Sequence, residues 1–225
     1  MVSLDGQISR VLRSREQARQ TYDRYSRLYD LIGGQFERKY ALLGVQQLRL
    51  QSGERVLEIG YGTGHMLVAM AEDVGETGHV YGIDISSGMY RIANQRLHKA
   101  GVVSQVTIVV GDALELPFQS NFFDAVFMSF TLELFDTPEI PFLLQQCKRV
   151  LKPTGRLGVV ALAKKHPAGL VQRVYESLHD FFPHWVDCRP IYPSKILQKN
   201  GFMIINNYQL PMFGLQVELV LARNR

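Results

Sequence analysis

The feature that most constrains the fold is an apolar segment that runs directly into three alternating glycines. Residues 56–59 are Val, Leu, Glu and Ile, and Gly60, Gly62 and Gly64 follow at every second position. Alternating glycines permit a tight turn and a close approach of backbone N–H groups to a ligand, and a helix N-terminus favours negative groups. The segment predicts a strand, a ligand-binding turn and a helix, in that order.

The spacing of these glycines separates the turn from a dinucleotide-binding loop. A dinucleotide loop would carry its third glycine at position 65, where this chain has His65. This difference in spacing argues against a nicotinamide dinucleotide as the ligand and favours another nucleoside. A glycine turn that serves only to pack a strand against a helix is the alternative.

Strand-like and helix-like segments alternate from residue 55 onward. Apolar runs rich in β-branched residues, typical of buried parallel strands, occupy 56–59, 80–83, 106–110, 125–128 and 157–162. Helical spacing of apolar residues occupies 66–74, 88–100 and 139–151. The alternation predicts an α/β fold with a parallel sheet and helices on both faces.

Both ends of the chain depart from this alternation. Residues 202–208 and 215–221 are two strand-like runs with no room for a helix between them, so we expect an antiparallel hairpin at one sheet edge. Residues 7–50 are helical in pattern. We therefore expect an N-terminal helical cap or lid over residues 1–50 and one α/β domain over residues 51–225.

Two acids follow the second and third predicted strands. Asp84 ends residues 80–84, and Asp112 follows residues 106–110. Because the carboxyl ends of parallel strands meet in one crevice, both acids are expected beside the glycine turn. A carboxylate at Asp84 can accept hydrogen bonds from two ribose hydroxyls, and one at Asp112 can accept from an exocyclic amine. A nucleoside is the predicted ligand.

The order of these elements resembles the class I S-adenosylmethionine-dependent methyltransferases over about residues 53–163. The segments that carry the resemblance are 58–64, 84, 111–113, 123–125 and 149–155. It implies a Rossmann-like sheet, parallel with one antiparallel C-terminal strand, and S-adenosyl-L-methionine as cofactor, released as S-adenosyl-L-homocysteine. The cofactor-binding residues that it implies are Glu58, Gly60, Gly62, Thr63, Gly64, Asp84, Ile85, Met89, Asp112, Ala113, Ser129 and Tyr29.

The N-terminal segment resembles the entry segment of the ubiquinone/menaquinone-biosynthesis methyltransferases and of bacterial phospholipid N-methyltransferases. The resemblance implies a lid role for Tyr22, Tyr25, Tyr29 or Asp30, and core packing is the alternative. Residues 1–50 hold nine Lys and Arg against five Asp and Glu, which accounts for the whole net charge of +4. A helix with Ile8, Val11 and Leu12 on one side and Arg10, Arg13 and Arg15 around it predicts weak peripheral contact with an anionic membrane; a solvated face is the alternative.

The segment after the fourth predicted strand bears on the acceptor. The quinone branch carries Gly-Leu-Arg-Asn there, whereas residues 129–135 of this chain contain neither Arg nor Asn. The apolar residues in this segment favour a small apolar or lipid-like acceptor, methylated at O, N or C. The candidate catalytic groups are Glu133, which we expect at the mouth of the site as general base, then His65 and Tyr25. A surface carboxylate beside a helix is the alternative for Glu133.

Other classes of protein find little support. The two cysteines, Cys147 and Cys188, cannot form a disulfide framework, the histidines lack the spacing of a metal site, and no Gly-x-Ser-x-Gly motif is present. No apolar stretch of about 18 residues occurs. Residues 51–225 hold 16 basic and 16 acidic side chains, which argues against nucleic acid. We expect a cytoplasmic enzyme, and the sequence does not determine its oligomeric state. An RNA or protein methyltransferase and a non-catalytic cofactor-binding module are the alternatives.

Overall fold

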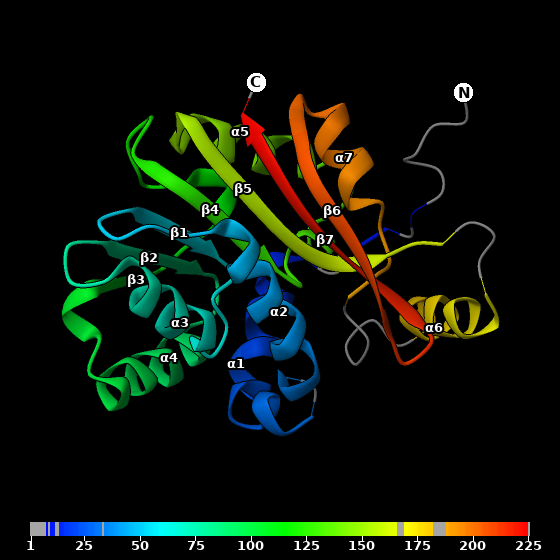
Figure 1. Cartoon of the computed structure of the whole chain (residues 1–225). Coiled ribbons are helices and arrows are strands. Elements are labelled where there is room, and N and C mark those ends of the chain that lie inside the picture. The colour runs from blue at the N-terminus through cyan, green and yellow to red at the C-terminus, as the bar shows by residue number, and fades with distance from the viewer. Residues whose placement is uncertain are drawn as a thin grey trace.

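The computed structural model describes residues 8, 10–11, 14–32, 34–165, 169–181 and 188–224, with the side chains at 24–35, 170 and 178–181 left out. Within these ranges seven strands form one sheet in the order β3-β2-β1-β4-β5-β7-β6 (Figure 1). The strands are β1 (Arg55–Ile59), β2 (His79–Asp84), β3 (Val106–Val110), β4 (Phe123–Ser129), β5 (Leu151–Ala163), β6 (Phe202–Met212) and β7 (Leu215–Asn224). Strands β1 to β5 pair in parallel, and β7 pairs antiparallel with both β5 and β6.

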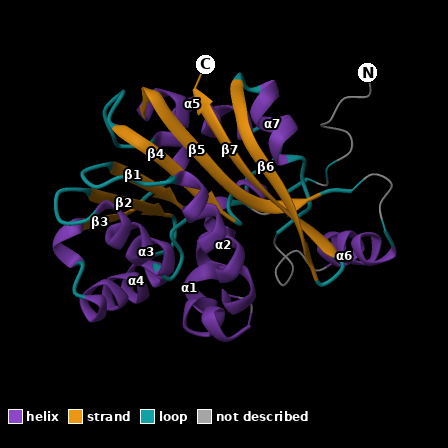
Figure 2. Cartoon of the chain, in the orientation of Figure 1, coloured by secondary structure: helices purple, strands orange, loops and turns teal. Residues whose placement is uncertain are grey.

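Helices cover both faces of the sheet (Figure 2). One face packs against α2 (Gly34–Leu48), α3 (His65–Val74) and α4 (Ser87–Ala100), and the other against α5 (Ile140–Val150) and α7 (Pro193–Lys199). Helix α1 (Arg15–Ile32) contacts α2 and α4, and α6 (Leu170–Phe181) lies beside the β6–β7 hairpin. None of the described helices is long and apolar enough to cross a bilayer.

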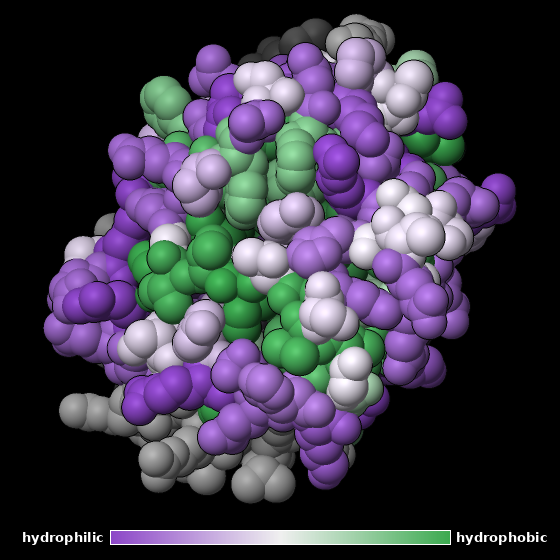
Figure 3. All heavy atoms as spheres, turned by 90° about the vertical axis from the view of Figure 1, so that its left-hand side faces the viewer, coloured by the Kyte–Doolittle hydropathy of each residue, from purple (hydrophilic) through white to green (hydrophobic). Residues whose placement is uncertain are grey.

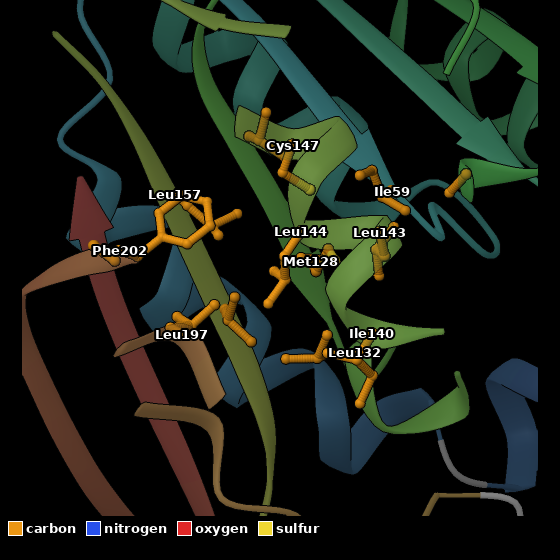
Figure 4. Close-up of a cluster of buried hydrophobic side chains, with 14 of the residues drawn as sticks. Ile59, Met128, Leu132, Ile140, Leu143, Leu144, Cys147, Leu157, Leu197 and Phe202 are labelled. Atoms are coloured by element: carbon orange, nitrogen blue, oxygen red, sulfur yellow. The ribbon is translucent and has the colours of Figure 1, made fainter. Parts of the chain in front are cut away.

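The apolar runs of the sequence explain the two core layers. Figure 4 shows Met128 of β4 and Leu157 of β5 packed against Leu143, Leu144 and Cys147 of α5. The other layer sets Val56 and Phe127 against α2, α3 and α4. Neighbouring residues of a strand point to opposite faces, so a continuous apolar run serves both layers.

The predicted fold class and the hairpin are confirmed, and the largest differences lie in β5 and in the N-terminal helices. Strand β5 begins at Leu151 and not at the predicted residue 157, because Phe123 of β4 already pairs with Leu151. The pairing is then interrupted and resumes between Ala125 and Arg156. The helical segment predicted for residues 7–50 is two helices, and Ala41, Val45 and Leu48 of the second lie in the core. That second helix thus belongs to the layer that covers the sheet.

One edge of the sheet is formed by β3. Figure 3 looks onto this side of the molecule and shows apolar side chains gathered in the middle of a polar surround. Val110, at the carboxyl end of β3, is 47% exposed. This end of β3 leads directly into the cavity described next.

Candidate functional site

A cavity of about 260 Å³ opens at the carboxyl ends of β1, β2, β3 and β4. It lies where β1 is flanked by β2 on one side and by β4 on the other, the position at which ligands bind in open α/β sheets. The strand-end residues that line it are Ile59, Gly60, Gly62, Ile83, Asp84, Ile85, Gly111, Asp112, Ala113, Ser129, Phe130 and Thr131.

The glycine turn after β1 has a backbone that other residues would strain. Gly60, Gly62 and Gly64 have φ of 74°, 51° and 83°, in the region that favours glycine. A Cβ atom at Gly60 would lie 2.4 Å from Oγ1 of Thr131, and one at Gly64 would lie 2.9 Å from Cβ of Ala93. The close packing of α4 and of the segment after β4 on the turn therefore requires glycine at both positions.

Asp84 ends β2 and faces the cavity. Its Oδ2 accepts a hydrogen bond from the Gly62 N–H at 2.9 Å, and its Oδ1 accepts one from the Ser86 N–H at 2.9 Å. Loss of solvent around the carboxyl group raises the pKa of Asp84 to about 6, although both N–H groups act in the opposite direction. The hydrogen bond to Gly62 holds the glycine turn against the end of β2.

Asp112 follows β3 and forms an ion pair with a residue of α1. Its Oδ1 accepts from the Leu114 N–H at 2.9 Å, and its Oδ2 accepts from the guanidinium of Arg15. Arg15 also donates to Glu139 at 2.7 Å. One arginine of α1 thus bridges two carboxylates that line the cavity.

A second anchor joins α1 to the N-terminus of α4. Oδ1 of Asp23 accepts from the Ser86 hydroxyl and from the Gly88 N–H, each at 2.7 Å. The Ser86 oxygen in turn accepts from the Met89 N–H at 3.0 Å, and Met89 lines the cavity. A carboxylate at a helix N-terminus is stabilised by the free N–H groups there. The Asp23–Ser86 contact links α1 to the residue that holds Asp84.

The segment before α1 also lies against the protein. Ile8 is buried in the core, and Val11 lines the cavity. Arg10 donates two hydrogen bonds to Asp136, at 2.8 and 2.6 Å. The apolar side chains predicted to meet a membrane thus face the protein, while Leu12 and Arg13 lie outside the described residues.

A smaller hollow of about 80 Å³ lies on the other side of the glycine turn. Glu58 lines it, and burial raises the pKa of this carboxyl well above its usual range. Oε2 of Glu58 is buried without a hydrogen-bond partner among the described residues. Thr63 and His65 also line the hollow, and Nδ1 of His65 contacts a guanidinium nitrogen of Arg96 at 3.0 Å.

The structure brings most of the predicted cofactor-binding residues to these two spaces. The larger cavity takes Gly60, Gly62, Asp84, Ile85, Met89, Asp112, Ala113 and Ser129, and the smaller one takes Glu58 and Thr63. Gly64 caps α3 behind the turn. The candidate base His65 lies at the smaller hollow. The side chains of Tyr25 and Tyr29 lie outside the described residues.

The structure does not bring Glu133 to either space. The residue sits in the short helix η4 (Leu132–Leu134), fully buried, and accepts a hydrogen bond from the Leu162 N–H of β5 at 3.0 Å. Arg189, also buried, donates to the carbonyl of Glu133 at 3.1 Å and to Thr137 at 3.0 Å. Because η4 turns the carboxylate toward β5, the expected place of Glu133 at the mouth of the site was wrong.

Sequence reasoning missed four charged residues of the cavity region: Arg15, Asp23, Asp136 and Glu139. In the sequence, Glu139 is only the first residue of a predicted helix. The pattern around Arg15 indicates a basic surface, although the excess of positive charge in residues 1–50 was a signal that this segment meets acids elsewhere in the chain.

Comparison with known proteins agrees with this geometry. Residues 56–155 match the protein-family model described as a methyltransferase domain. The chain is 35% identical over 184 residues to the ubiquinone/menaquinone biosynthesis C-methyltransferase UbiE of Vibrio cholerae, covering 82% of this chain and 64% of that protein. Residues 56–155 thus carry a methyltransferase domain, and the chain is similar to class I methyltransferases. The UbiE of Paraburkholderia xenovorans is 36% identical over 140 residues, which are 62% of this chain and 56% of the relative.

The chain therefore spans less than two thirds of the length of these curated relatives. Another relative, the demethylmenaquinone methyltransferase of Listeria welshimeri, is 32% identical over 148 residues, which are 66% of this chain and 61% of that protein. The cofactor of the class I methyltransferases is S-adenosyl-L-methionine.

Solved structures share the fold of this chain at low identity. The [4+2]-cyclase SpnF superposes with a TM-score of 0.77 at 20% identity, over 96% of this chain and 98% of the cyclase. A SAM-dependent methyltransferase from Aquifex aeolicus superposes with a TM-score of 0.60 at 22% identity, over 93% of this chain and 98% of that chain. These likenesses concern the fold alone.

Proposed function

We propose that this protein transfers a methyl group from S-adenosyl-L-methionine to a small apolar or lipid-like acceptor. The observation that carries the proposal is the division of the larger cavity. The glycine turn and two acids line its β1, β2 and β3 side. Phe130, Leu134 and Phe135 line the side that follows β4, where the two acids, Asp136 and Glu139, are paired with Arg10 and Arg15. A polar half suits the nucleoside, and an apolar half suits the acceptor.

The residues present fit the cofactor. Asp84 has both oxygens oriented by backbone N–H groups and faces the cavity, where it would accept from the ribose hydroxyls. Asp112 would accept from the adenine amine, and Met89 and Ala113 would contact the adenine faces. The buried, unpartnered Oε2 of Glu58 in the adjoining hollow suits the ammonium group of the methionine part.

When bound, the cofactor supplies a methyl group already activated on a sulfonium, so this chain has to align the acceptor and exclude water. Helix α1 covers the cavity through Arg15, Ala18 and Tyr22. Asp136 also lines the cavity, but its hydrogen bonds with Arg10 keep its pKa below the usual range, which makes it a poor base. These features favour an acceptor whose nucleophilic atom needs little help from a strong base.

We further propose a lipid-like acceptor within this class, for which the names of the quinone-biosynthesis relatives speak. The absence of Arg and Asn in residues 129–135 speaks against C-methylation of a quinol itself. As part of this proposal we retain the division at residue 50. Within the N-terminal residues 1–50, α1 caps the cavity and α2 packs on the sheet, and residues 51–225 form the methyltransferase domain.

The test has two steps. S-adenosylmethionine should raise the melting temperature of the wild-type protein and of Asp73→Ala, a control at an exposed acid on α3, but not that of Asp84→Ala. Labelled cofactor is then incubated in parallel with a cell lipid extract and with cell RNA and protein, and the product is identified by mass spectrometry. A wild-type protein indifferent to the cofactor would refute the proposal. Cofactor binding without S-adenosylhomocysteine would indicate a non-catalytic module, and labelled RNA or protein would indicate the other alternative.

A further inference from the structure

Four exposed apolar side chains from three distant segments gather at one corner of the molecule. They are Phe36 of α2, Val171 and Val174 of α6, and Phe213 at the turn of the β6–β7 hairpin, with exposed fractions of 56%, 48%, 52% and 70%. We call this group the tip patch. Figure 1 shows the hairpin end beside α6.

Direct contacts hold the tip patch together. The rings of Phe36 and Phe213 meet edge to face, with centroids 4.9 Å apart. The Tyr40 hydroxyl donates to the carbonyl of Pro211 at 2.6 Å, which ties the hairpin to α2. Val171 packs so closely on the turn that a Cβ atom at Gly214 would lie 3.0 Å from its Cγ2. The tip patch is therefore a built surface of three elements.

Among the described side chains of α2 and α6 beside the tip patch, the exposed charges are positive. Arg38, Lys39 and Arg173 are exposed, whereas the acids on the described parts of α2 and α6, Glu37 and Glu176, are half-buried. Glu176 also forms an ion pair with Lys164 at 3.1 Å. Residues 211–216 of the hairpin turn carry no charge. An uncharged, aromatic end thus projects from a basic surround.

We infer that the tip patch docks the protein on an anionic lipid bilayer. Exposed aromatic and aliphatic side chains can enter the interface, and basic side chains are attracted to anionic headgroups. A second copy of the chain fits less well, because a twofold contact through the tip patch would set the basic side chains of the two copies against each other. The opposite charge of the lipid surface favours the bilayer.

The location of the tip patch relates docking to the site. Phe36 directly precedes Glu37 and Arg38, which line the smaller hollow beside the glycine turn. A protein docked through this corner holds the carboxyl edge of the sheet near the membrane. The inference thereby adds a partner surface to the proposed function, yet it rests on exposed residues and not on methyl transfer, so the two can fail separately.

Vesicle sedimentation of the full chain tests the inference. Wild-type protein should bind vesicles of phosphatidylcholine and phosphatidylglycerol and should bind pure phosphatidylcholine far less. The double variant Phe36→Ser/Phe213→Ser should lose at least about tenfold in affinity through lost apolar contact. Lys39→Ala/Arg173→Ala should lose about fivefold for each charge removed and should be less sensitive to salt.

Matched controls separate effects on vesicle binding from effects on folding. Phe142, 62% exposed on α5, and Lys99, exposed on α4, lie outside the tip patch, so Phe142→Ser and Lys99→Ala should bind like wild type. Unchanged melting temperatures and an unchanged shift with S-adenosylmethionine would show that the variants are folded. The inference is overturned if wild type ignores the anionic vesicles or if the Phe36/Phe213 variant binds them equally. It is also overturned if light scattering shows a wild-type dimer that these substitutions dissociate.

Discussion

Removing the carboxylate of Asp23 tests whether α1 is a lid latched to the site. Asp23→Ala deletes two hydrogen bonds of 2.7 Å, from Ser86 and Gly88, and a weaker one of 3.3 Å from the Ser87 hydroxyl. Once α1 detaches, the donors at residues 86–88 form hydrogen bonds with water instead. The contribution of each bond to the docking of α1 is therefore its net free energy relative to water. At a half-buried, solvent-screened position each short bond contributes about 1 kcal/mol, and the charge at the helix N-terminus adds about 0.5 kcal/mol.

The sum is a loss of about 2.5 kcal/mol, or about a 70-fold shift toward a detached α1. Asp23→Asn keeps an acceptor oxygen for Ser86 and Gly88 but loses the charge, so we expect about half of this loss in free energy. Glu16→Ala is the control on the same helix. Glu16 contacts Arg19 and Gln20 of α1 itself, so its removal should leave the docking of α1 unchanged.

Hydrogen exchange measures the docking directly. Amides of α1 in Asp23→Ala should exchange about 70-fold faster than in wild type, whereas amides of α5 should keep their protection. The dissociation constant for S-adenosylmethionine should rise in the same variant, because α1 lines the cavity. Equal exchange of α1 in wild type and in Asp23→Ala would show that the latch does not hold the helix.

Three further outcomes follow from the site. Since the pKa of Asp84 is raised to about 6 and its ionised form is the one that accepts from hydroxyls, cofactor affinity by calorimetry should rise about tenfold from pH 5 to pH 7; a flat profile would contradict this. Arg189→Leu should lower the free energy of unfolding in urea by about 3 kcal/mol, because buried carbonyls after β4 lose their donor, and a loss below about 1 kcal/mol would count against it. Gly60→Ala should lower the melting temperature more than Gly101→Ala, because both have positive φ but only Gly60 is crowded, with Thr131 at 2.4 Å; equal losses would show that the turn adapts.

Much of the sheet could be predicted because apolar runs and turn residues are local signals. The runs at 56–59 and 106–110 became β1 and β3, and the pair after residue 201 became the β6–β7 hairpin. Asp84 and Asp112 could be placed beside the glycine turn because parallel strands end at one edge of the sheet. Their roles toward the cofactor stay predictions.

Long-range polar pairs could not be predicted. Arg15 meets Asp112 across 97 residues, and Asp23 meets Ser86 across 63. In a sequence, such residues look like any solvated charge, because the pairing depends on where tertiary packing sets the elements. The prediction for Glu133 was wrong for a related reason. Its position after a strand resembles that of Asp84, but the direction of its side chain depends on a local turn.

The way in which Arg189 holds the segment after β4 has a consequence for acceptor choice. Its guanidinium donates to the main-chain carbonyls of Glu133 and Phe135, groups that every residue type possesses. The path of the backbone there is thus independent of which side chains at Leu134 and Phe135 face the cavity. Substitutions at these two positions can change the shape of the proposed acceptor side of the cavity while the hydrogen bonds from Arg189 to the backbone remain. This segment is therefore the natural place to evolve or engineer specificity for a different substrate.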